Sequence, residues 1–363
     1  MEALLEPLQS DGGRLFEYQG ATAARDFGDP AAEYRAARET AALFPLTWRG
    51  ALRFVGPDRR QWLHGQVTND IQGLPDGAWN EAAALNVQGH MLAMLRVFAL
   101  PDALLADLPA AIVASTAQTL DRYLIMEKVE IEDASSEVCL FSIQGPRAAE
   151  AVRTATGVEA AALTPHRLTV QEGPGGAPLI VARATQTGES GFDMFADAGV
   201  AALLWARLSE AVRAVGGRPA GWEALNTLRV EAGLPWWGHE LDPSVVPLEA
   251  RLERAISLTK GCYVGQEIIA RIAARGRVNT LLGGLRLSGD GLPRPGSPIL
   301  GDEKRIGRVT TAVHSPALGA PIALAFLRRE WTEPGRSVAV EIEGSRVPAE
   351  TCALPFVPVR AEP

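Results

Sequence analysis

A repeated strand–corner–helix pattern in the first half of the chain constrains its fold more than any other feature. Residues 52–57 have the apolar character of a strand that ends in a Gly-Pro corner, and a helical segment follows. Residues 140–146 repeat this pattern. Proline suits the first turn of a helix because its missing N–H has no hydrogen-bond partner there. The repeat therefore predicts two related α/β modules.

The remaining segments complete an α+β fold. An amphipathic helix is predicted over residues 200–215, and strands are predicted over 179–182 and 191–195. After Asn279, glycine and proline separate short strands, which predicts a small all-β barrel. The four strands expected there span residues 281–287, 305–313, 320–326 and 337–342. We expect a first module at 46–135, a second at 1–45 plus 136–278, and a C-terminal β-barrel at 279–363.

Composition narrows the classes of function. The 363 residues are 47% hydrophobic and carry a net charge of -8, which argues against nucleic acid as the main ligand. No run approaches about 18 apolar residues, so no membrane span is expected. The N-terminus carries acidic residues where a secretory signal carries basic ones. The three cysteines are far apart and form no Cys-x-x-Cys pair, which favours a cytoplasmic protein without a zinc site or a self-contained iron–sulfur cluster.

Residues 260–267 form an octapeptide that concentrates reactive groups between two glycines. The residues of interest are Lys260, Gly261, Cys262, Tyr263, Gly265, Gln266 and Glu267. A helix that begins near Val264 would place Cys262 just before a positive helix N-terminus, which favours a thiolate. Lys260, one of only three lysines, would lower the pKa of the thiol further. The alternative is a structural cysteine in a glycine-bounded turn, with Lys260 solvated.

The octapeptide resembles the signature of the YgfZ-type folate-binding proteins, relatives of the glycine-cleavage T-protein (aminomethyltransferase). Further segments resemble this family in the expected order: 66–71, 84–90, 144–146, 187–192, 228–233, 306–311 and 315–319. Residues 246–252 are more similar to the aminomethyltransferase and mitochondrial-type branches. The resemblance implies three domains around a central cavity that holds tetrahydrofolate. It also implies a role in the assembly or maintenance of iron–sulfur proteins, with no metal held by this chain alone.

Four residues are candidates for folate contacts: three lie outside the octapeptide and one, Tyr263, lies within it. The Glu189 carboxylate, between Gly188 and Ser190, suits the paired N–H donors of a reduced pterin; the alternative is an acid in a hairpin turn. Asp70 is a candidate to orient or deprotonate the folate amines, or else a turn aspartate. Arg229 lies in an apolar helical stretch and needs a partner such as Glu231, Asp70 or a ligand carboxylate; the alternative to a ligand contact is a purely structural ion pair. Tyr263 is included as a fourth contact.

Several functions are compatible with these residues. The first is a folate-binding accessory factor for iron–sulfur apoproteins or their assembly factors, with Cys262 as the working thiol beside Lys260. The alternative is a folate-dependent one-carbon transferase that uses Asp70 and Glu189. A cysteine hydrolase would need His239 or His314 as the base for Cys262. A scaffold that only binds folate would need no thiol chemistry.

Overall fold

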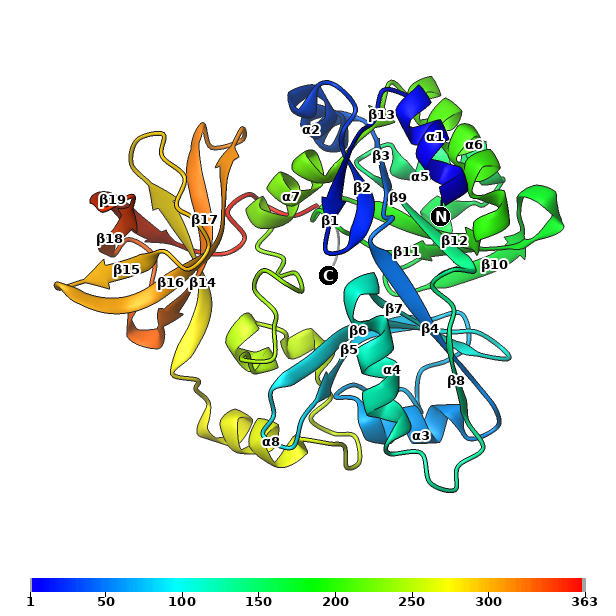
Figure 1. The fold of residues 1–363 in the computed structure, drawn as a ribbon, viewed down its shortest axis with the longest axis horizontal. Coiled ribbons are helices and arrows are strands. Elements are labelled where there is room, and N and C mark those ends of the chain that lie inside the picture. The colour runs from blue at the N-terminus through cyan, green and yellow to red at the C-terminus, as the bar shows by residue number, and fades with distance from the viewer. Residues whose placement is uncertain (1, 361–363) are drawn as a thin grey trace.

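The computed structural model describes residues 2–360 and confirms the α+β fold (Figure 1). Two sheets with their helices form one side of the molecule, and a closed barrel forms the other. A long connection between helices α7 (Trp222–Glu231) and α8 (Gln266–Arg275) joins the two parts. The octapeptide lies at the end of this connection.

The first sheet is antiparallel, with strand order β5-β6-β7-β4-β8. Its strands are β4 (Arg49–Val55), β5 (Trp79–Leu85), β6 (Met91–Ala99), β7 (Leu104–Pro109) and β8 (Glu130–Asp133). Helices α3 (Arg59–Gln66) and α4 (Val113–Asp121) contribute buried apolar residues to the core on one face of this sheet. Residues on the opposite face of this sheet line the cavity of the candidate site.

The second sheet has the order β10-β11-β12-β9-β3-β13. Its strands are β3 (Ala42–Pro45), β9 (Val138–Gln144), β10 (Leu168–Glu172), β11 (Pro178–Arg183), β12 (Gly191–Asp197) and β13 (Arg218–Pro219). Phe192 and Met194 face the core formed with α1 (Glu2–Ser10), α5 (Ala148–Thr156) and α6 (Ala201–Ala214), whereas Phe195 faces the other core. This alternation is the two-residue period of a strand. Helices α2 (Pro30–Glu39) and α7 supply that other core, beside the hairpin of β1 (Arg14–Tyr18) and β2 (Ala21–Asp26).

The C-terminal strands close into a barrel with the order β14-β17-β16-β15-β18-β19. Their bounds are β14 (Thr280–Leu287), β15 (Pro298–Gly301), β16 (Lys304–Ser315), β17 (Ala320–Arg328), β18 (Ser337–Ile342) and β19 (Ser345–Cys352). The four predicted strands are all present. Strands β15 and β19 were not predicted, because β15 is only four residues long and β19 carries a proline and few large apolar residues.

The internal repeat is confirmed at the level of backbone geometry. Strands β4 and β9 each end at a glycine with positive φ, 105° at Gly56 and 131° at Gly145, and each leads into a helix. A Cβ at Gly56 would lie 2.1 Å from the carbonyl oxygen of Lys128, and one at Gly145 would lie 2.6 Å from that of Thr40. Both corners therefore require glycine for the same two reasons, namely backbone conformation and close approach of the main chain.

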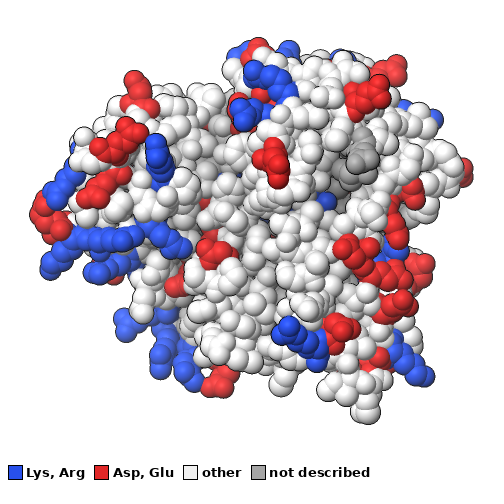
Figure 2. Space-filling view, in the orientation of Figure 1, with Lys and Arg blue, Asp and Glu red and all other residues white. Residues whose placement is uncertain are grey.

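Charged side chains are unevenly spread over the surface (Figure 2). Arg271, Arg275 and Arg277 are exposed around α8, where basic side chains gather below the barrel. Within residues 2–360, no helix combines the length and the apolar character needed to cross a membrane.

Candidate functional site

A cavity lies between the two sheets and the segment that follows α7. Its walls combine aromatic rings with arginine side chains: Tyr18, Trp48, Trp79, Trp236 and Trp237, and Arg49, Arg96, Arg183 and Arg254. Thr185, Gln186 and Ser190 add polar groups from the loop between β11 and β12. Among the residues described, none from the barrel lines this cavity. The cavity is therefore built by the two α/β modules and their connection.

Strand alternation explains how the first sheet supplies its wall. Trp79 and Glu81 are two residues apart on β5, and Met94 and Arg96 are two residues apart on β6. The Cα partner of Glu81 is Arg96, so these side chains share one face of the sheet. All four residues line the cavity.

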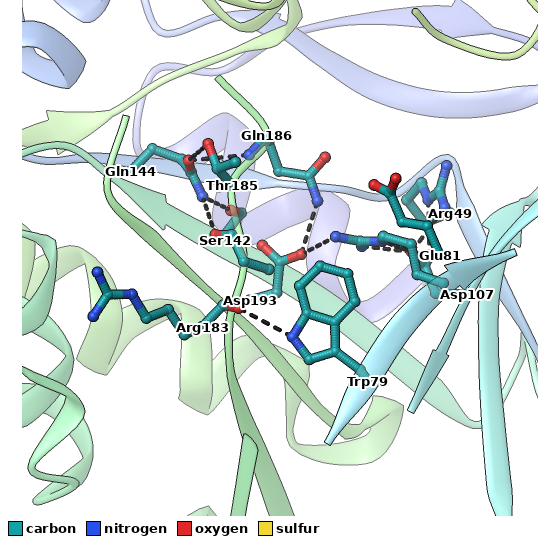
Figure 3. Close-up of polar contacts among 12 residues, drawn as sticks. Arg49, Trp79, Glu81, Asp107, Ser142, Gln144, Arg183, Thr185, Gln186 and Asp193 are labelled. Carbon is teal, nitrogen blue, oxygen red and sulfur yellow. Dashed lines mark hydrogen bonds and ion pairs between the residues drawn. The ribbon is translucent and has the colours of Figure 1, made fainter. Parts of the chain in front are cut away.

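A buried chain of charges connects the two sheets behind this wall (Figure 3). Asp107 accepts hydrogen bonds from Arg49 Nε at 2.8 Å and from Arg96 Nε at 2.6 Å. Arg96 Nη1 reaches Asp193 of the second sheet at 2.5 Å, and Gln186 Nε2 donates to the same carboxylate at 2.7 Å. Burial opposes ionisation of Asp107, but the charges of Arg49 and Arg96 outweigh it and lower its pKa. The network fixes two cavity arginines and holds the modules in register.

Glu81 is the only carboxylate among the described residues that line the cavity. Its side chain is 15% exposed and forms a two-point ion pair with Arg254, one contact of which joins Arg254 Nη2 and Glu81 Oε1 at 3.2 Å. Burial opposes the charge of Arg254, but Glu81 raises its pKa overall. Glu81 was not predicted, since a lone acid in an alternating strand gives no sequence signal.

Arg229 is paired inside the protein and does not line the cavity. Its partners are Glu240 and Asn226, together with Thr311 of the barrel. The structural ion pair is therefore present, but its acid is Glu240 and not Glu231 or Asp70. Segment 236–241 folds back on itself and brings the Glu240 carboxylate to the guanidinium. This reversal of the chain, which brings Glu240 to Arg229, could not be predicted from local sequence. Arg229 in turn places its guanidinium 5.2 Å from the ring centre of Trp236, on the cavity wall.

His239, considered from sequence only as a base for Cys262, supports the same wall. Its Nε2 lies 2.9 Å from the hydroxyl oxygen of Tyr18, a cavity residue at the tip of the β1–β2 hairpin. Burial, with a smaller contribution from the charge of Arg229, lowers the pKa of His239 to about 4. The imidazole is therefore neutral at pH 7. No hydrogen bond joins it to Cys262 in the described part of the chain, which removes support from the cysteine hydrolase hypothesis.

Glu189 is fully buried behind the cavity loop. Its Oε1 accepts from Arg38 Nη1 at 2.5 Å, and Arg360 lies 3.8 Å from Oε2. The carboxylate is thus engaged by two arginines, although its neighbours Thr185, Gln186 and Ser190 line the cavity. A contact between Glu189 and folate stays a prediction.

Lys260 of the octapeptide anchors the main chain, and Tyr263 packs into an apolar core beside it. The Lys260 ammonium donates to the backbone carbonyls of His64, Val67 and Asn69, at and just beyond the C-terminal end of α3. Lysine at a helix C-terminus satisfies carbonyls that lack helical partners. Burial lowers the pKa of Lys260 to about 8, with a smaller opposing effect from Asp70. Tyr263 is 8% exposed, and the centre of its ring lies 4.9 Å from the Lys260 ammonium nitrogen.

Cys262 is exposed and lies outside the cavity. Helix α8 begins at Gln266, two residues later than predicted, so Cys262 precedes the first helical residue by four positions. The delay has a physical cause: Gly265 adopts φ +82° as the N-cap, and a Cβ there would lie 2.6 Å from the carbonyl oxygen of Asn86. Helix α8 thus begins farther from Cys262 than predicted, and the Lys260 ammonium is directed to carbonyls at the end of α3.

Asp70 lies beside the octapeptide and outside the cavity. Its Oδ1 accepts from the backbone N–H of Gly73 at 2.8 Å and lies 3.1 Å from His64 Nδ1. The Asp70 side chain is 48% exposed and lies in a turn, which is the alternative given above to a folate contact. Its role toward folate stays a prediction.

Comparison with known proteins follows the same division of the chain. Residues 4–260 match the GCVT N-terminal domain, and residues 282–358 match the glycine cleavage T-protein C-terminal barrel domain. The chain belongs to the glycine cleavage T-protein family. These similarities do not show that the chain belongs to the narrower YgfZ branch.

Relatives of this family are similar along almost the whole chain. The aminomethyltransferase of Rubrobacter xylanophilus is 34% identical over 354 residues, which covers 97% of this chain and 93% of the relative. That of Saccharopolyspora erythraea is 32% identical over 348 residues, with 95% and 94% covered. The crystal structure of aminomethyltransferase T from Bartonella henselae matches with a TM-score of 0.89 over 98% of both chains. At 22% sequence identity, this last similarity shows the fold.

Proposed function

We propose that this protein is a folate-dependent one-carbon transferase that moves an aminomethyl carbon to tetrahydrofolate. The observation that carries the proposal is the cavity between the two modules, with aromatic walls and several arginines. The names of the relatives that cover 95% and 97% of the chain support it. This reading takes precedence over the iron–sulfur accessory role suggested by the octapeptide.

The lining residues fit a reduced folate. The half-buried indoles of Trp236 and Trp237 offer flat apolar surface to the pterin and benzoyl rings. Thr185 and Gln186 provide hydroxyl and amide groups for the polar edge of the pterin. Arginine is suited to the carboxylates of the glutamate tail. When bound, tetrahydrofolate supplies the amine nitrogens that accept the carbon.

Glu81 is the candidate proton acceptor for this transfer. As the carbon bridges two folate nitrogens, both nitrogens lose a proton, its bond to the aminomethyl nitrogen breaks to release ammonia, and its bond to the carrier breaks to release the carrier group. A carboxylate within the cavity can accept these protons and pass them to the groups that leave. Arg254 orients the Glu81 carboxylate through a two-point ion pair. Asp70 and Glu189, the acids favoured by sequence, are engaged elsewhere.

An assay of aminomethyl transfer tests the proposal. The purified protein would be combined with tetrahydrofolate and the aminomethyl-loaded carrier protein of a glycine cleavage system, and methylenetetrahydrofolate would be measured. We expect turnover that depends on both components. Binding of tetrahydrofolate without turnover would leave a folate-binding scaffold, and absence of both would contradict the proposal.

A second candidate is the YgfZ-like accessory factor for iron–sulfur proteins. The specific observation that favours it is Cys262, exposed within the octapeptide and free to meet a partner protein. Aconitase activity would be measured in cells that lack this gene and carry either the wild type or Cys262→Ala at equal level. Restoration by the wild type alone would support this candidate, and equal restoration by both would show that the thiol is not required.

A further inference from the structure

Asn69 joins the two residues of the cavity ion pair through their main chains. Its amide Nδ2 donates to the backbone carbonyl of Glu81 at 2.7 Å and to that of Arg254 at 3.0 Å. The side chains of the same two residues form the ion pair that lines the cavity. Asn69 itself is not among the described residues that line the cavity. One side chain outside the cavity thus contacts the backbone on both sides of the ion pair.

Thr68 places Asn69 between β5 and the connection that carries Arg254. The Thr68 N–H donates to the carbonyl of Ala83 at 3.0 Å, and the Thr68 hydroxyl oxygen accepts from the N–H of Ala83 at 2.8 Å. On the other side, the hydroxyl donates to the carbonyl of Ala255 at 2.6 Å. Thr68 is fully buried. These bonds fix the register of the connection against β5, so the Asn69 amide meets its two carbonyls in a defined geometry.

Every polar atom of the Asn69 side chain has a partner. Its two N–H groups are directed to the two carbonyls, and its Oδ1 accepts from the N–H of Asp70 at 2.9 Å. A reversed amide would place an oxygen against both carbonyls, so these partners determine its orientation. The backbone carbonyl of Asn69 accepts from the Lys260 ammonium at 3.1 Å. The octapeptide therefore supports the same segment.

We propose that Asn69 is a positioning residue for the one-carbon transfer, because it holds Arg254 in register with Glu81 and so places the proton acceptor in the cavity. The inference rests on the proposed function and deepens it. A shift of about 1 Å in a reacting group can cost about 100-fold in rate. A primary amide presents two N–H donors from one nitrogen, which neither serine nor aspartate can do.

A single variant, a matched control and a double-mutant cycle test the assignment. Asn69→Ser keeps a hydroxyl for the Asp70 N–H but is too short to span the two carbonyls. Asn80→Ala is the control, because Asn80 Nδ2 donates to the Asp70 carbonyl at 2.8 Å and makes no hydrogen bond to Arg254 or Glu81 in the described part of the chain. Glu81→Gln, alone and combined with Asn69→Ser, completes the cycle. Thermal unfolding of each variant accompanies the assays.

The first measurement is the rate of aminomethyl transfer. Asn69→Ser should lower kcat about 10- to 100-fold and change KM for tetrahydrofolate less than about threefold, whereas Asn80→Ala should match the wild type. In the Glu81→Gln background, Asn69→Ser should lower kcat no further, because the group that Asn69 positions no longer accepts the proton. An equal loss of kcat in both backgrounds, or a similar loss in Asn80→Ala, would show a general structural effect and overturn the inference.

Exchange of the Arg254 Nε–H with water gives a second measurement that needs no activity. In protein carrying isotope-labelled arginine, its NMR signal is identified by its absence from Arg254→Lys. This N–H donates to Glu81, so it should exchange slowly in the wild type and in Asn80→Ala, and about 10-fold faster in Asn69→Ser. Unchanged exchange in folded Asn69→Ser overturns the inference.

The two measurements separate failure of the inference from failure of the proposed function. A wild type without turnover would contradict the proposed function, and the exchange rates would still decide whether Asn69 holds the ion pair. Should Asn69→Ser not fold, Asn69→Gln takes its place with the same expected and contradicting outcomes, because its longer side chain moves both donors away from the carbonyls.

Discussion

The cavity and the octapeptide use charged side chains in opposite ways. In the cavity, Arg49, Arg96 and Arg254 face carboxylates and present fixed polar groups to enclosed space. In the octapeptide, Lys260 turns inward to main-chain carbonyls, and Cys262 remains on the surface. The comparison teaches that a conspicuous motif can stabilise a chain connection, while a site is assembled from side chains that are scattered along the sequence.

The largest effect is expected from removing the cation that joins the two sheets. Arg96→Met leaves Asp107 and Asp193 short of a buried partner, so the free energy of unfolding should fall by about 3 to 5 kcal/mol. Urea denaturation measures this change. Lys260→Met, which removes contacts to carbonyls and to the Tyr263 ring but leaves no buried carboxylate without its cation, serves as the counterpart from the octapeptide and should cost less. Equal losses in the two variants would break the comparison.

Glu81→Gln tests whether the chemistry belongs to the cavity. The amide keeps the size of the side chain but accepts protons poorly, so kcat for aminomethyl transfer should fall about 100-fold, or about 2.7 kcal/mol. The Kd for tetrahydrofolate, measured by calorimetry, should change much less. Unaltered kcat in a folded variant would show that Glu81 has no part in the reaction.

Gly265→Ala tests the structural role of the octapeptide. An alanine at φ +82° meets the Asn86 carbonyl, so we expect a loss of at least about 2 kcal/mol in unfolding free energy. Gly276→Ala is the matched control, because Gly276 has φ +67° and no atom within 4 Å of the added Cβ. Its loss should be about 1 kcal/mol from conformation alone. Similar losses at both positions would contradict the packing argument.

His239 makes the cavity wall sensitive to acid. Its pKa of about 4 in the folded protein lies below the ordinary value of 6.5, so the unfolded chain binds the proton more readily. The contribution of His239 to the free energy of unfolding is fully present above pH 6.5 and decreases as the pH falls toward 4. At pH 5 the decrease is about 2 kcal/mol. Unfolding free energies of the wild type and His239→Gln at pH 7.5 and 5 measure the effect. The variant should lose less than the wild type; a parallel loss would show that carboxylates alone account for the acid sensitivity.

The fold was more predictable than the site. The Gly-Pro corners, the 200–215 helix and four barrel strands all carry local signals, and each is present. Cys262 and Asp70 attracted attention because of their sequence neighbours, but they lie outside the cavity. Glu81 went unnoticed because its meaning depends on Arg254, a partner from a distant connection. Pairing of that kind is a property of tertiary structure, which local sequence patterns do not contain.

Calorimetric titration of tetrahydrofolate into three proteins tests the central claim, that the cavity rather than the octapeptide is the folate site. The proteins are the wild type, Trp236→Leu in the cavity wall and Cys262→Ala in the octapeptide. We predict equal Kd values for the wild type and Cys262→Ala, and at least about tenfold weaker binding by Trp236→Leu, since ring stacking contributes about 1 kcal/mol or more. Loss of binding in Cys262→Ala with unchanged binding in Trp236→Leu would contradict the account.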